Sequence, residues 1–390
     1  MHILFVADAD NKYGASCSMK QLVRGILEYY DDVEISVVLP LRTDVTNELG
    51  NYYRQLGCNV YKIFYEPFYQ NIPEQKWRFF VKYFIRGMEY LIGRWTGLFF
   101  LSRKIDMKEI DIIHSNSSRE DLSASLAIKY RKPLIWHIRE FGDDCFSFRK
   151  NYIELMNQAA YEFIAVSDAV RNHWIEKGLD RRKTNRVYNG ICTEVNVKKE
   201  YRETNDSKMK FLMIGSVYEN KGQEQVIKAC ALMMEKDRKR VAIDIIGDGS
   251  ETYIKKLKEM IKDYDLSSVV RFRGYQKEVW KNICSYDCGL MCSKSEGFGR
   301  VTAEYMMAGL PVIASDIEAN CELIIENENG LLYQWNNIND LKEKMVYLLN
   351  DADVMKKMGE KVRKYAISHF SIALCSELIH KEYLKIFEKG

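Results

Sequence analysis

The sequence lacks a dominant charge, paired cysteines and a long apolar run. Its 58 Lys and Arg residues nearly balance 55 Asp and Glu residues, and the net charge of +3 excludes nucleic-acid binding through bulk electrostatics. The ten cysteines form no C-x-x-C pair, and dispersed reduced thiols in a long chain indicate the cytosol. The opening residues, MHILFVADAD, have no basic flank, so we expect a buried strand there rather than a signal peptide.

Motifs for metals and dinucleotides are absent or weak. Cys284, Cys288 and Cys292 are evenly spaced, but no histidine or carboxylate cluster accompanies them, so we expect no metal site there. The two D-x-D sequences, at 8–10 and 351–353, occupy a strand–helix turn and a helix boundary, where metal-dependent sugar transfer is not expected. Since no G-x-G-x-x-G follows the first strand, a dinucleotide enzyme is not favoured either.

Short apolar runs alternate with helical periodicity along most of the chain, which predicts parallel sheets covered by helices on both faces. A chain of 390 residues is too long for one hydrophobic core, so we expect two domains. The predicted strands are 2–7, 33–39, 59–64, 111–114, 133–137 and 163–167, then 210–215, 241–247, 269–274, 287–292 and 310–315. The fold class is therefore α/β, with doubly wound domains at 1–191 and 210–370 and a polar linker at 192–209. We expect ligands beyond the carboxyl ends of the strands, in a cleft between the domains.

The most informative segment is SKSEGFGRVTAEYMMAGLPVIASD, residues 293–316. A strand is expected to end near Cys292, followed by a glycine-containing loop and a helix that starts near Gly299. The glycines let backbone N–H groups approach a ligand closely, and a helix N-terminus favours an anion. Glu296 and Glu304 are carboxylates that can accept hydrogen bonds from a vicinal diol of a sugar or a ribose. Alternatively, Glu304 is a solvated helix residue and the glycines only shape a turn.

The same segment resembles the signature of the family-4 retaining glycosyltransferases, whose Glu-x7-Glu motif here reads EGFGRVTAEYMMAGLPVIA. The resemblance implies the GT-B fold, in which two Rossmann-like domains face each other across a central cleft. It also implies that a last helix, 371–390, crosses back to the first domain. The activity implied is that of a retaining, metal-independent, hexosyl-type glycosyltransferase, similar to those of bacterial capsule and exopolysaccharide synthesis. No cofactor is expected besides the co-substrate, a nucleotide-diphosphate sugar, for which a UDP-sugar is the first expectation.

The resemblance assigns the donor diphosphate to the second domain. Lys221, within IGSVYENKGQEQVIKA, matches the family's lysine and would place a cation near the diphosphate. The arginine usual after Gly215 is replaced by Ser216, which removes one expected cation. Arg300 occupies a position that is often aliphatic, and it is a candidate to compensate for this loss.

The resemblance also implies individual roles within the motif. Glu304 would hold the ribose, while Glu296 and the backbone of 297–299 would orient the donor sugar. The predicted donor-binding residues are Gly14, Ser216, Lys221, Tyr275, Glu296, Gly297, Phe298, Gly299, Arg300 and Glu304. The predicted catalytic residues are His137, Glu296 and Lys221. Lys221, the helix N-terminus and the backbone at Gly14 would stabilise the leaving diphosphate.

In the first domain, three segments that follow strands resemble the family's cleft residues. Gly14, in NKYGAS, occupies the place of the family's glycine-rich loop, where two adjacent glycines are more usual. His137, in WHIREF, matches a histidine that lies near the transferred sugar. Asn116, in HSNSS, together with Arg139 and Glu140, is predicted to build the acceptor side. A local salt bridge is the alternative for Arg139 and Glu140.

Some features leave other functions open. Where the family commonly has two glycines, this chain has Glu318 and Ala319, which either alter sugar preference or face solvent. A sugar-nucleotide epimerase with the same fold, or a non-catalytic partner subunit, remains an alternative to a transferase. The intact glutamate pair and Lys221 argue against the non-catalytic alternative.

The stretch KWRFFVKYFIRGMEYLIGRW, residues 76–95, has five basic residues and one acidic residue among many aromatic ones. On a helical wheel, nine apolar side chains fill one arc, which we expect to pack on the sheet of the first domain. The opposite face would then present aromatic and basic side chains, including Arg78, Lys82 and Arg86, to an anionic membrane surface. Charges recur too often for a membrane span.

This stretch belongs to an insertion at about 65–109 in the domain that would bind the acceptor. We therefore predict a peripheral enzyme at the cytoplasmic face of the cell membrane. It would move a sugar onto a hydroxyl of a lipid-linked glycan precursor of a bacterial surface polysaccharide. Its partners would be the nucleotide sugar, the glycan acceptor and the anionic membrane, with no nucleic acid.

Overall fold

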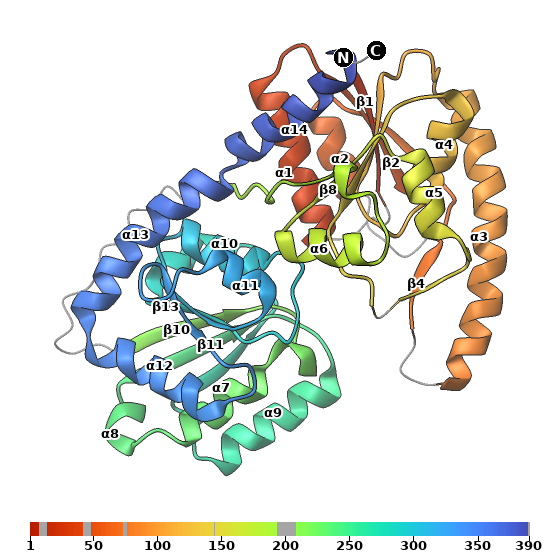
Figure 1. Ribbon diagram of the computed structural model, residues 1–390. Helices are drawn as coiled ribbons and strands as arrows, with labels where there is room; N and C mark the ends of the chain where they lie inside the picture. The colour runs from red at the N-terminus through yellow and green to blue at the C-terminus, as the bar shows by residue number, and fades with distance from the viewer. Residues whose placement is uncertain (8–13, 42–47, 73–75, 144, 193–207, 389–390) are drawn as a thin grey trace. The chain divides into compact units, whose positions relative to one another are not determined.

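The computed structural model describes residues 1–390 except 8–13, 42–47, 73–75, 144, 193–207 and 389–390, and it leaves out the side chains of 71 and 76–79. The chain forms two compact units (Figure 1). Unit 1 comprises Met1–Gly190 and Ile372–Gly390, and unit 2 comprises Ile191–Ser371. Most of the segment expected to be a linker lies outside the described residues. Each unit has its own parallel sheet.

The sheet of unit 1 has seven strands in the order β3-β2-β1-β5-β6-β8-β9. They are β1 (His2–Val6), β2 (Glu34–Pro40), β3 (Asn59–Ile63), β5 (Ile112–Ser115), β6 (Leu134–Ile138), β8 (Glu162–Ala165) and β9 (Thr184–Arg186). The helices of this unit are α1 (Gly14–Tyr29), α2 (Glu48–Gln55), α3 (Lys76–Lys104), α4 (Leu122–Tyr130), α5 (Tyr152–Ala159), α6 (Asp168–Glu176) and the last helix, α14 (Ile372–Glu388). The strand order reverses between β1 and β5, and ligands bind at such switch points in open α/β sheets.

The hydrophobic core of unit 1 joins residues from both ends of the chain. The alternating strand–helix pattern places Phe5 of β1 and Leu22 of α1 in one buried cluster. Ile379 and Tyr383 of α14 are fully buried in the same cluster, although they come from the end of the chain. Helix α14 is therefore a structural part of unit 1 and lies beside α1 (Figure 1).

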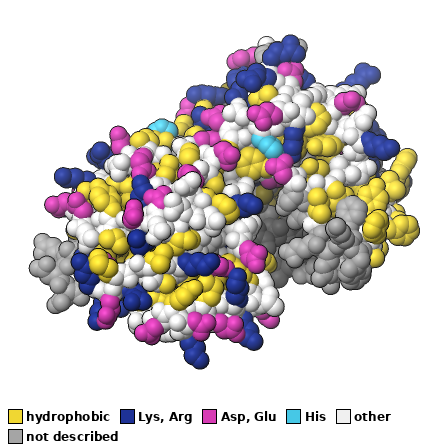
Figure 2. All heavy atoms as spheres, turned by 60° about the horizontal axis from the view of Figure 1, so that its bottom comes forward, with side chains coloured by type: hydrophobic (Ala, Val, Ile, Leu, Met, Phe, Trp, Pro, Cys, Tyr) yellow, Lys and Arg dark blue, Asp and Glu magenta, His cyan; other side chains and the backbone are white. Residues whose placement is uncertain are grey.

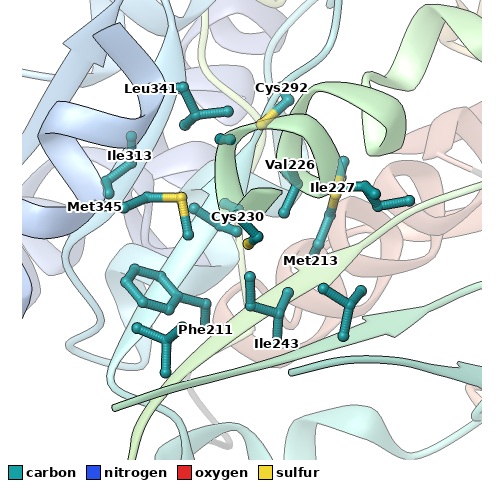
Figure 3. Close-up of a cluster of buried hydrophobic side chains, with 14 of the residues drawn as sticks. Phe211, Met213, Val226, Ile227, Cys230, Ile243, Cys292, Ile313, Leu341 and Met345 are labelled. Atoms are coloured by element: carbon teal, nitrogen blue, oxygen red, sulfur yellow. The ribbon is translucent and has the colours of Figure 1, made fainter. Parts of the chain in front are cut away.

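Unit 2 has a six-stranded parallel sheet in the order β12-β11-β10-β13-β14-β15. Its strands are β10 (Met209–Ile214), β11 (Val241–Ile246), β12 (Val270–Gly274), β13 (Cys288–Met291), β14 (Val312–Ser315) and β15 (Gly330–Tyr333). Its α-helices are α7 (Gln223–Ala231), α8 (Glu235–Arg238), α9 (Glu251–Asp263), α10 (Arg300–Met307), α11 (Glu318–Leu323), α12 (Ile338–Asn350) and α13 (Ala352–Phe370). In the core, Val226 and Cys230 of α7 pack over Phe211 and Ile243 of the sheet, with Met345 of α12 beside them (Figure 3).

The predicted fold class, two doubly wound α/β domains, is confirmed. The structure also contains strands that the sequence pattern did not indicate. Strands β9 and β15 lie at sheet edges and span only three and four residues, too few for a clear period. A short antiparallel pair, β4 (Tyr69–Asn71) with β7 (Cys145–Ser147), lies outside both main sheets.

The predicted orientation of the helix at 76–95 is wrong. Eight of the nine apolar side chains expected to face the sheet are 50% to 79% exposed, and the ninth, that of Trp77, is not described. The exposed members are Phe80, Val81, Phe84, Ile85, Met88, Leu91, Ile92 and Trp95. Figure 2 shows hydrophobic side chains gathered along the edge of unit 1 that α3 forms. None of the described helices has both the length and the apolarity to cross a membrane.

The face of α3 that contacts unit 1 is built from small and hydrogen-bonding residues. Gly93 lies so close to the chain that a Cβ there would be 2.8 Å from the Cα of Tyr65. The Tyr90 hydroxyl is buried and donates to Oδ2 of Asp121 over 2.8 Å. The close backbone approach and this hydrogen bond fix the helix with the side that carries Tyr90 and Gly93 inward.

Two of the basic residues predicted to face a membrane, Lys82 and Arg86, are partly buried. Nη1 of Arg86 lies 3.1 Å from Oε1 of the buried Glu66 and 2.9 Å from Oε2 of Glu89. Lys82 is half-buried, and burial is the main cause that lowers its pKa. The side chain of Arg78 lies outside the description. The basic residues therefore do not form an outer face of their own among the described side chains.

Candidate active site

The loop after β13 and the start of α10 form the centre of the candidate site in unit 2. Helix α10 begins at Arg300, directly after the E-G-F-G sequence and close to the predicted start, and ends at Met307. Gly299 precedes it with a φ of 73°, in the left-handed region that favours glycine. The N-terminus of α10 lies at the end of this loop, where the N–H groups of the first turn and the helix dipole favour an anion.

Lys221 and Glu296 form an ion pair, with 2.5 Å between Nζ and Oε1. Lys221 ends a short 3-10 turn, η2 (Glu219–Lys221), after β10, while Glu296 lies in the loop after β13. Gly222 lets these two loops meet, because a Cβ at this position would lie only 2.1 Å from the carbonyl oxygen of Cys292. The Lys-Gly pair thus holds a cation beside the first glutamate of the motif.

Glu304 is buried, with 7% of its surface exposed, so the alternative of a solvated helix residue is wrong. Nε of Arg300 donates to Oε1 of Glu304 over 2.8 Å, one turn apart on α10. Burial raises the pKa of the Glu304 carboxyl, and the Arg300 guanidinium opposes that rise. Arg300 therefore favours the charged form of the second glutamate of the motif, while burial disfavours it.

The other predicted donor residues of unit 2 occupy different settings. The carbonyl oxygen of Ser216 accepts a 3.0 Å hydrogen bond from Nε2 of Gln223. The ring of Phe298 is buried edge-to-face against Phe370, with 5.7 Å between centroids, so its backbone is the part left to contact a donor. Tyr275 directly follows β12 and is half-exposed.

Glu318 and Ala319, which stand where the family commonly has two glycines, have different surroundings. Glu318 is exposed in the first turn of α11, whereas Ala319 is fully buried. Asn320, which the sequence did not single out, accepts a 3.2 Å hydrogen bond from Oγ1 of Thr302 in α10. Its Nδ2 donates to the carbonyl oxygen of Ser315 over 3.0 Å. This asparagine therefore ties the first turns of α10 and α11 to the end of β14.

In unit 1, three predicted residues meet at the carboxyl ends of β5 and β6. Nδ1 of His137 lies 3.2 Å from Nε2 of His114 and 3.3 Å from Nη2 of Arg139. Arg139 donates from Nε to Oδ1 of Asn116 over 2.9 Å, and from Nη1 to Oδ1 of Asn189. His137, Arg139 and Asn116 thus belong to one buried hydrogen-bonded group, as expected for residues that follow neighbouring parallel strands.

The two histidines of this group are neutral. Burial, and secondly the Arg139 guanidinium, lower the pKa of His137 and of His114 well below the ordinary histidine value. The Nε2 atom of His137 is buried and has no hydrogen-bond partner among the described residues. A buried polar atom without a partner costs on the order of 1–3 kcal/mol, so this atom is a candidate for contact with a ligand.

Glu140 takes its hydrogen bonds from the H-S-N-S-S sequence. Its Oε1 accepts from Oγ of Ser117 over 2.7 Å, and from N and Oγ of Ser118 over 2.9 and 2.6 Å. Arg139 and Glu140 are adjacent in sequence, but the hydrogen bonds described above join them to different partners. Both side chains are held near the switch point of the sheet.

Gly14 is the exposed first residue of α1, and a Cβ there would meet nothing within 4 Å. The preceding residues, 11–13, of the predicted glycine-containing loop lie outside the described part of the chain. Nδ2 of Asn116 donates to the carbonyl oxygen of Ala15 over 3.3 Å. The first turn of α1 is thereby connected to the group around His137.

No cluster of three or more His, Cys, Asp or Glu side chains is arranged for a metal ion within the described ranges. Cys288 and Cys292 are buried thiols, and burial raises the pKa of Cys292 to about 12. Asp351 of the second D-x-D caps α13 by accepting from the N–H of Val354 over 2.9 Å. The first D-x-D falls mostly outside the description, since 8–10 are omitted.

Three functional candidates escaped the sequence patterns: His114, Asn189 and Tyr383. His114 stands inside a predicted strand, where a buried structural residue is the ordinary interpretation. Tyr383 reaches it from α14, 269 residues further along the chain. Only the fold brings these residues together, so their distances along the sequence do not indicate that they form one group.

Comparison with known proteins relates the chain to glycosyltransferases. The family model "Glycosyltransferase Family 4" matches residues 44–195, and "Glycosyl transferases group 1" matches residues 196–365. An uncharacterized glycosyltransferase of Methanocaldococcus jannaschii is 27% identical over 76% of this chain and 81% of its own length. An uncharacterized 41.2 kDa protein in the cps region of Klebsiella pneumoniae is 25% identical over 65% of this chain and 74% of its own.

Among solved structures, Anabaena HepE in complex with UDP has the same fold, with a TM-score of 0.78 and 19% identity over 99% of this chain and 100% of its own. The sheets and the matched models define a GT-B glycosyltransferase. This chain belongs to the group 1 glycosyltransferases of glycosyltransferase family 4, whose members retain the configuration of the transferred sugar. The predicted family, fold and enzyme class are thereby confirmed.

Proposed function

We propose that the chain transfers a sugar from a UDP-sugar to a hydroxyl of a lipid-linked glycan, in the synthesis of a bacterial surface polysaccharide. The observation that carries the donor half is the meeting of Lys221, Glu296 and the N-terminus of α10. The solved complexes of HepE with UDP and with UDP-glucose support a UDP-sugar as the donor. The similarity to the protein in the cps region supports the surface polysaccharide.

In this proposal three charged residues of unit 2 contact different parts of the donor, and a fourth, Arg300, acts on one of the three. Lys221 and the N-terminus of α10 bind the diphosphate, because both attract an anion. Glu304, whose charged form Arg300 favours, accepts hydrogen bonds from the ribose diol. Glu296 orients the donor sugar together with the backbone of 297–299. Since Lys221 is already paired with Glu296, the diphosphate joins an existing ion pair rather than an isolated lysine.

The proposed reaction is a displacement on one face of the sugar. The bond between the anomeric carbon and the phosphate oxygen breaks, and the bond to the acceptor oxygen forms on the same face. The acceptor hydroxyl gives its proton to an oxygen of the leaving diphosphate. Lys221 and the N–H groups of α10 stabilise the charge that develops there, which is where preorganised donors contribute most to a rate.

Replacement of Lys221 by alanine, or of Glu304 by alanine, is the direct test of the donor site. We expect each variant to lose on the order of 100-fold or more in kcat/KM for the UDP-sugar, since each removes a charged contact with the donor. Sugar transfer would be followed by release of UDP and by mass spectrometry of the product. Assays without an acceptor would reveal the epimerase alternative as conversion of the donor.

A matched control is Lys228→Ala, which removes a lysine that pairs with Glu224 on α7 over 2.7 Å. Lys228 has no proposed role, so this variant should keep wild-type turnover. Thermal unfolding of all three variants would show that each still folds. Wild-type kcat/KM in Lys221→Ala and Glu304→Ala would contradict the donor assignment.

The proposed acceptor is lipid-linked because α3 presents an apolar face that unit 1 does not cover. This apolar face consists of the eight exposed side chains from Phe80 to Trp95 named above, continued by Phe99 and Phe100, which are also half-exposed. The helix as a whole carries seven basic residues and one acidic residue, Glu89. An apolar face with basic residues on the same helix suits the interface of an anionic bilayer. A second copy of the same helix would bring like charges together.

The membrane proposal predicts sedimentation of the protein with vesicles that contain anionic lipid. We expect Phe84→Ser/Leu91→Ser/Trp95→Ser to lose most of this binding, because it removes large apolar side chains that would enter the interface. Vesicles of phosphatidylcholine alone should bind the wild-type protein more weakly than vesicles with added phosphatidylglycerol, since they lack the anionic charge.

The control for this variant is Leu232→Ser/Met234→Ser, which removes two exposed apolar side chains of unit 2. It should bind vesicles like the wild-type protein. If the wild-type protein stays in the supernatant with both vesicle types, the membrane proposal is wrong. A dimer in analytical ultracentrifugation that the triple variant abolishes would instead identify the apolar face as a self-association surface.

A further inference from the structure

A chain of hydrogen bonds connects the last helix to the candidate site of unit 1. The hydroxyl of Tyr383, on α14, lies 2.7 Å from Nδ1 of His114. Nε2 of His114 lies 3.2 Å from Nδ1 of His137, and Nη2 of Arg139 lies 3.3 Å from the same atom. Tyr383 and the two histidines are each at most 1% exposed, so water does not compete for these bonds.

The donors and acceptors in this chain can be assigned from the chemistry of its members. A guanidinium group can only donate, so Nδ1 of His137 accepts from Arg139. Nδ1 of His137 therefore carries no proton, and Nε2 of His114 must donate to it. A neutral imidazole has one N–H, so Nδ1 of His114 accepts and the Tyr383 hydroxyl donates.

The same reasoning fixes the protonation of Nε2, the other ring nitrogen of His137. Because its Nδ1 only accepts, the single proton of the neutral ring is on Nε2. This is the buried atom that has no partner among the described residues. Both histidines have a pKa well below the ordinary value, through burial and then Arg139, which agrees with neutral rings. His137 therefore offers one N–H donor, and the hydrogen bonds at its Nδ1 fix the direction and the protonation of that donor.

We propose that Tyr383 and His114 are positioning residues that hold His137 as the neutral Nε2–H tautomer, so that it donates a hydrogen bond to a hydroxyl oxygen of a sugar substrate bound at unit 1. This inference rests on the proposed function, because it concerns a sugar substrate of the same reaction. It makes α14 a part of the catalytic machinery of unit 1 as well as of its hydrophobic core. A hydroxyl of the sugar supplies the partner that Nε2 lacks.

The test reads the tautomers directly in the full-length protein labelled with ¹⁵N-histidine. Long-range ¹H–¹⁵N spectra distinguish Nε2–H from Nδ1–H rings, and a His114→Gln variant assigns the two buried signals. We expect both rings as Nε2–H, without titration between about pH 6 and about pH 8. Finding His137 as the Nδ1–H tautomer, or as a ring that titrates in this range, would overturn the proposal.

Tyr383→Phe removes only the hydroxyl that fixes His114. We expect this variant to change the His114 signal and to lose about fivefold to tenfold in kcat/KM, as for loss of one oriented hydrogen bond. It should still fold, with a lower thermal midpoint, because Nδ1 of the buried His114 loses its donor. The matched control is Tyr30→Phe, because Tyr30, directly after α1, stacks on His380 of α14 with 3.7 Å between ring centroids but is not a member of the hydrogen-bond chain from Tyr383 to His137. It should leave both signals and kcat/KM unchanged.

The outcomes separate the inference from the proposed function. If Tyr383→Phe changes neither the histidine signals nor kcat/KM, the positioning role is wrong, although sugar transfer by the wild-type protein still stands. If the signals change while kcat/KM does not, His137 does not donate to the sugar in the rate-determining state, and the proposal fails. If the wild-type protein transfers no sugar, the proposed function fails, and the tautomers are still read without substrate.

Discussion

At the scale of single residues, the arginine of the candidate donor site in unit 2 is Arg300. Ser216 stands where the family usually has an arginine, and Arg300 is placed on the first residue of α10. Its guanidinium contacts Glu304 rather than remaining apart from the motif. The arginine thus opposes the effect of burial on the pKa of the Glu304 carboxyl, an interaction that the sequence alone did not predict.

Arg300→Leu should therefore change the pH dependence of donor binding. Without the guanidinium, burial acts alone on Glu304, so its pKa rises further and the carboxyl is protonated at higher pH. A protonated carboxyl is a poorer acceptor for the ribose, so the acid limb of the kcat/KM profile should move to higher pH. The KM for the UDP-sugar should increase by roughly tenfold near neutral pH, as for a lost charged contact.

This prediction is checked by steady-state kinetics across the pH range. Arg300→Lys keeps a cation near the carboxyl, so it should restore most of the wild-type profile. An acid limb that is the same in Arg300→Leu and in the wild-type protein would show that Arg300 does not control the protonation of Glu304.

At the scale of elements, the sequence predicted which segments form helices and strands, but it did not predict correctly which side of α3 packs against the protein. The apolar runs marked the central strands correctly, since buried parallel strands are continuous in hydrophobicity. The helical period of α3 was also correct, but its orientation was inverted. Hydrophobicity alone does not say which face meets the protein, whereas Gly93 and Gly97 on one side were a usable sign of close packing.

Gly93→Ala should loosen α3 from unit 1. The added Cβ would lie 2.8 Å from the Cα of Tyr65, so either the helix or the strand-end segment must shift. We expect a loss of roughly 1–3 kcal/mol in unfolding free energy, the usual cost of overpacking. Chemical denaturation measures the loss, and trypsin cleavage within α3 shows whether it is local.

The matched control is Gly87→Ala on the same helix, where the added Cβ would lie 3.4 Å from the ring of Phe148. Both substitutions improve helix propensity by a similar amount, about 1 kcal/mol, so their difference isolates the clash. Equal stability of the two variants would mean that α3 does not pack through Gly93.

At the scale of the whole molecule, residues close together in sequence belong to different units. Helix α13 ends at Phe370 in unit 2, and α14 begins at Ile372 in unit 1. The N–H of Ile191 donates to the carbonyl oxygen of Phe370 over 2.7 Å, so the two places where the chain passes from one unit to the other are adjacent. The distance between two residues along the sequence therefore does not predict whether they belong to the same unit.

Ile379→Ala should destabilise the first half of the chain rather than the neighbouring α13. Ile379 is fully buried in the cluster that contains α1 and β1, so the truncation leaves a cavity there. We expect a loss of roughly 2–5 kcal/mol. Hydrogen exchange with mass spectrometry should show faster exchange in peptides of α1 and unchanged exchange in those of α13.

Leu384→Ala is the control on the same helix, because Leu384 is exposed and should tolerate truncation. Faster exchange in α13 than in α1 after Ile379→Ala would contradict the assignment of α14 to unit 1.

The membership of α14 in unit 1 has a consequence for synthesis on the ribosome. The first 190 residues leave the exit tunnel without the helix that completes their core. Translation proceeds at about 5–20 residues per second, so the gap before α14 appears lasts on the order of ten seconds or more. During this interval the surface of α1 that α14 will cover remains open. The nascent first unit is therefore an expected client of chaperones until the last helix is released.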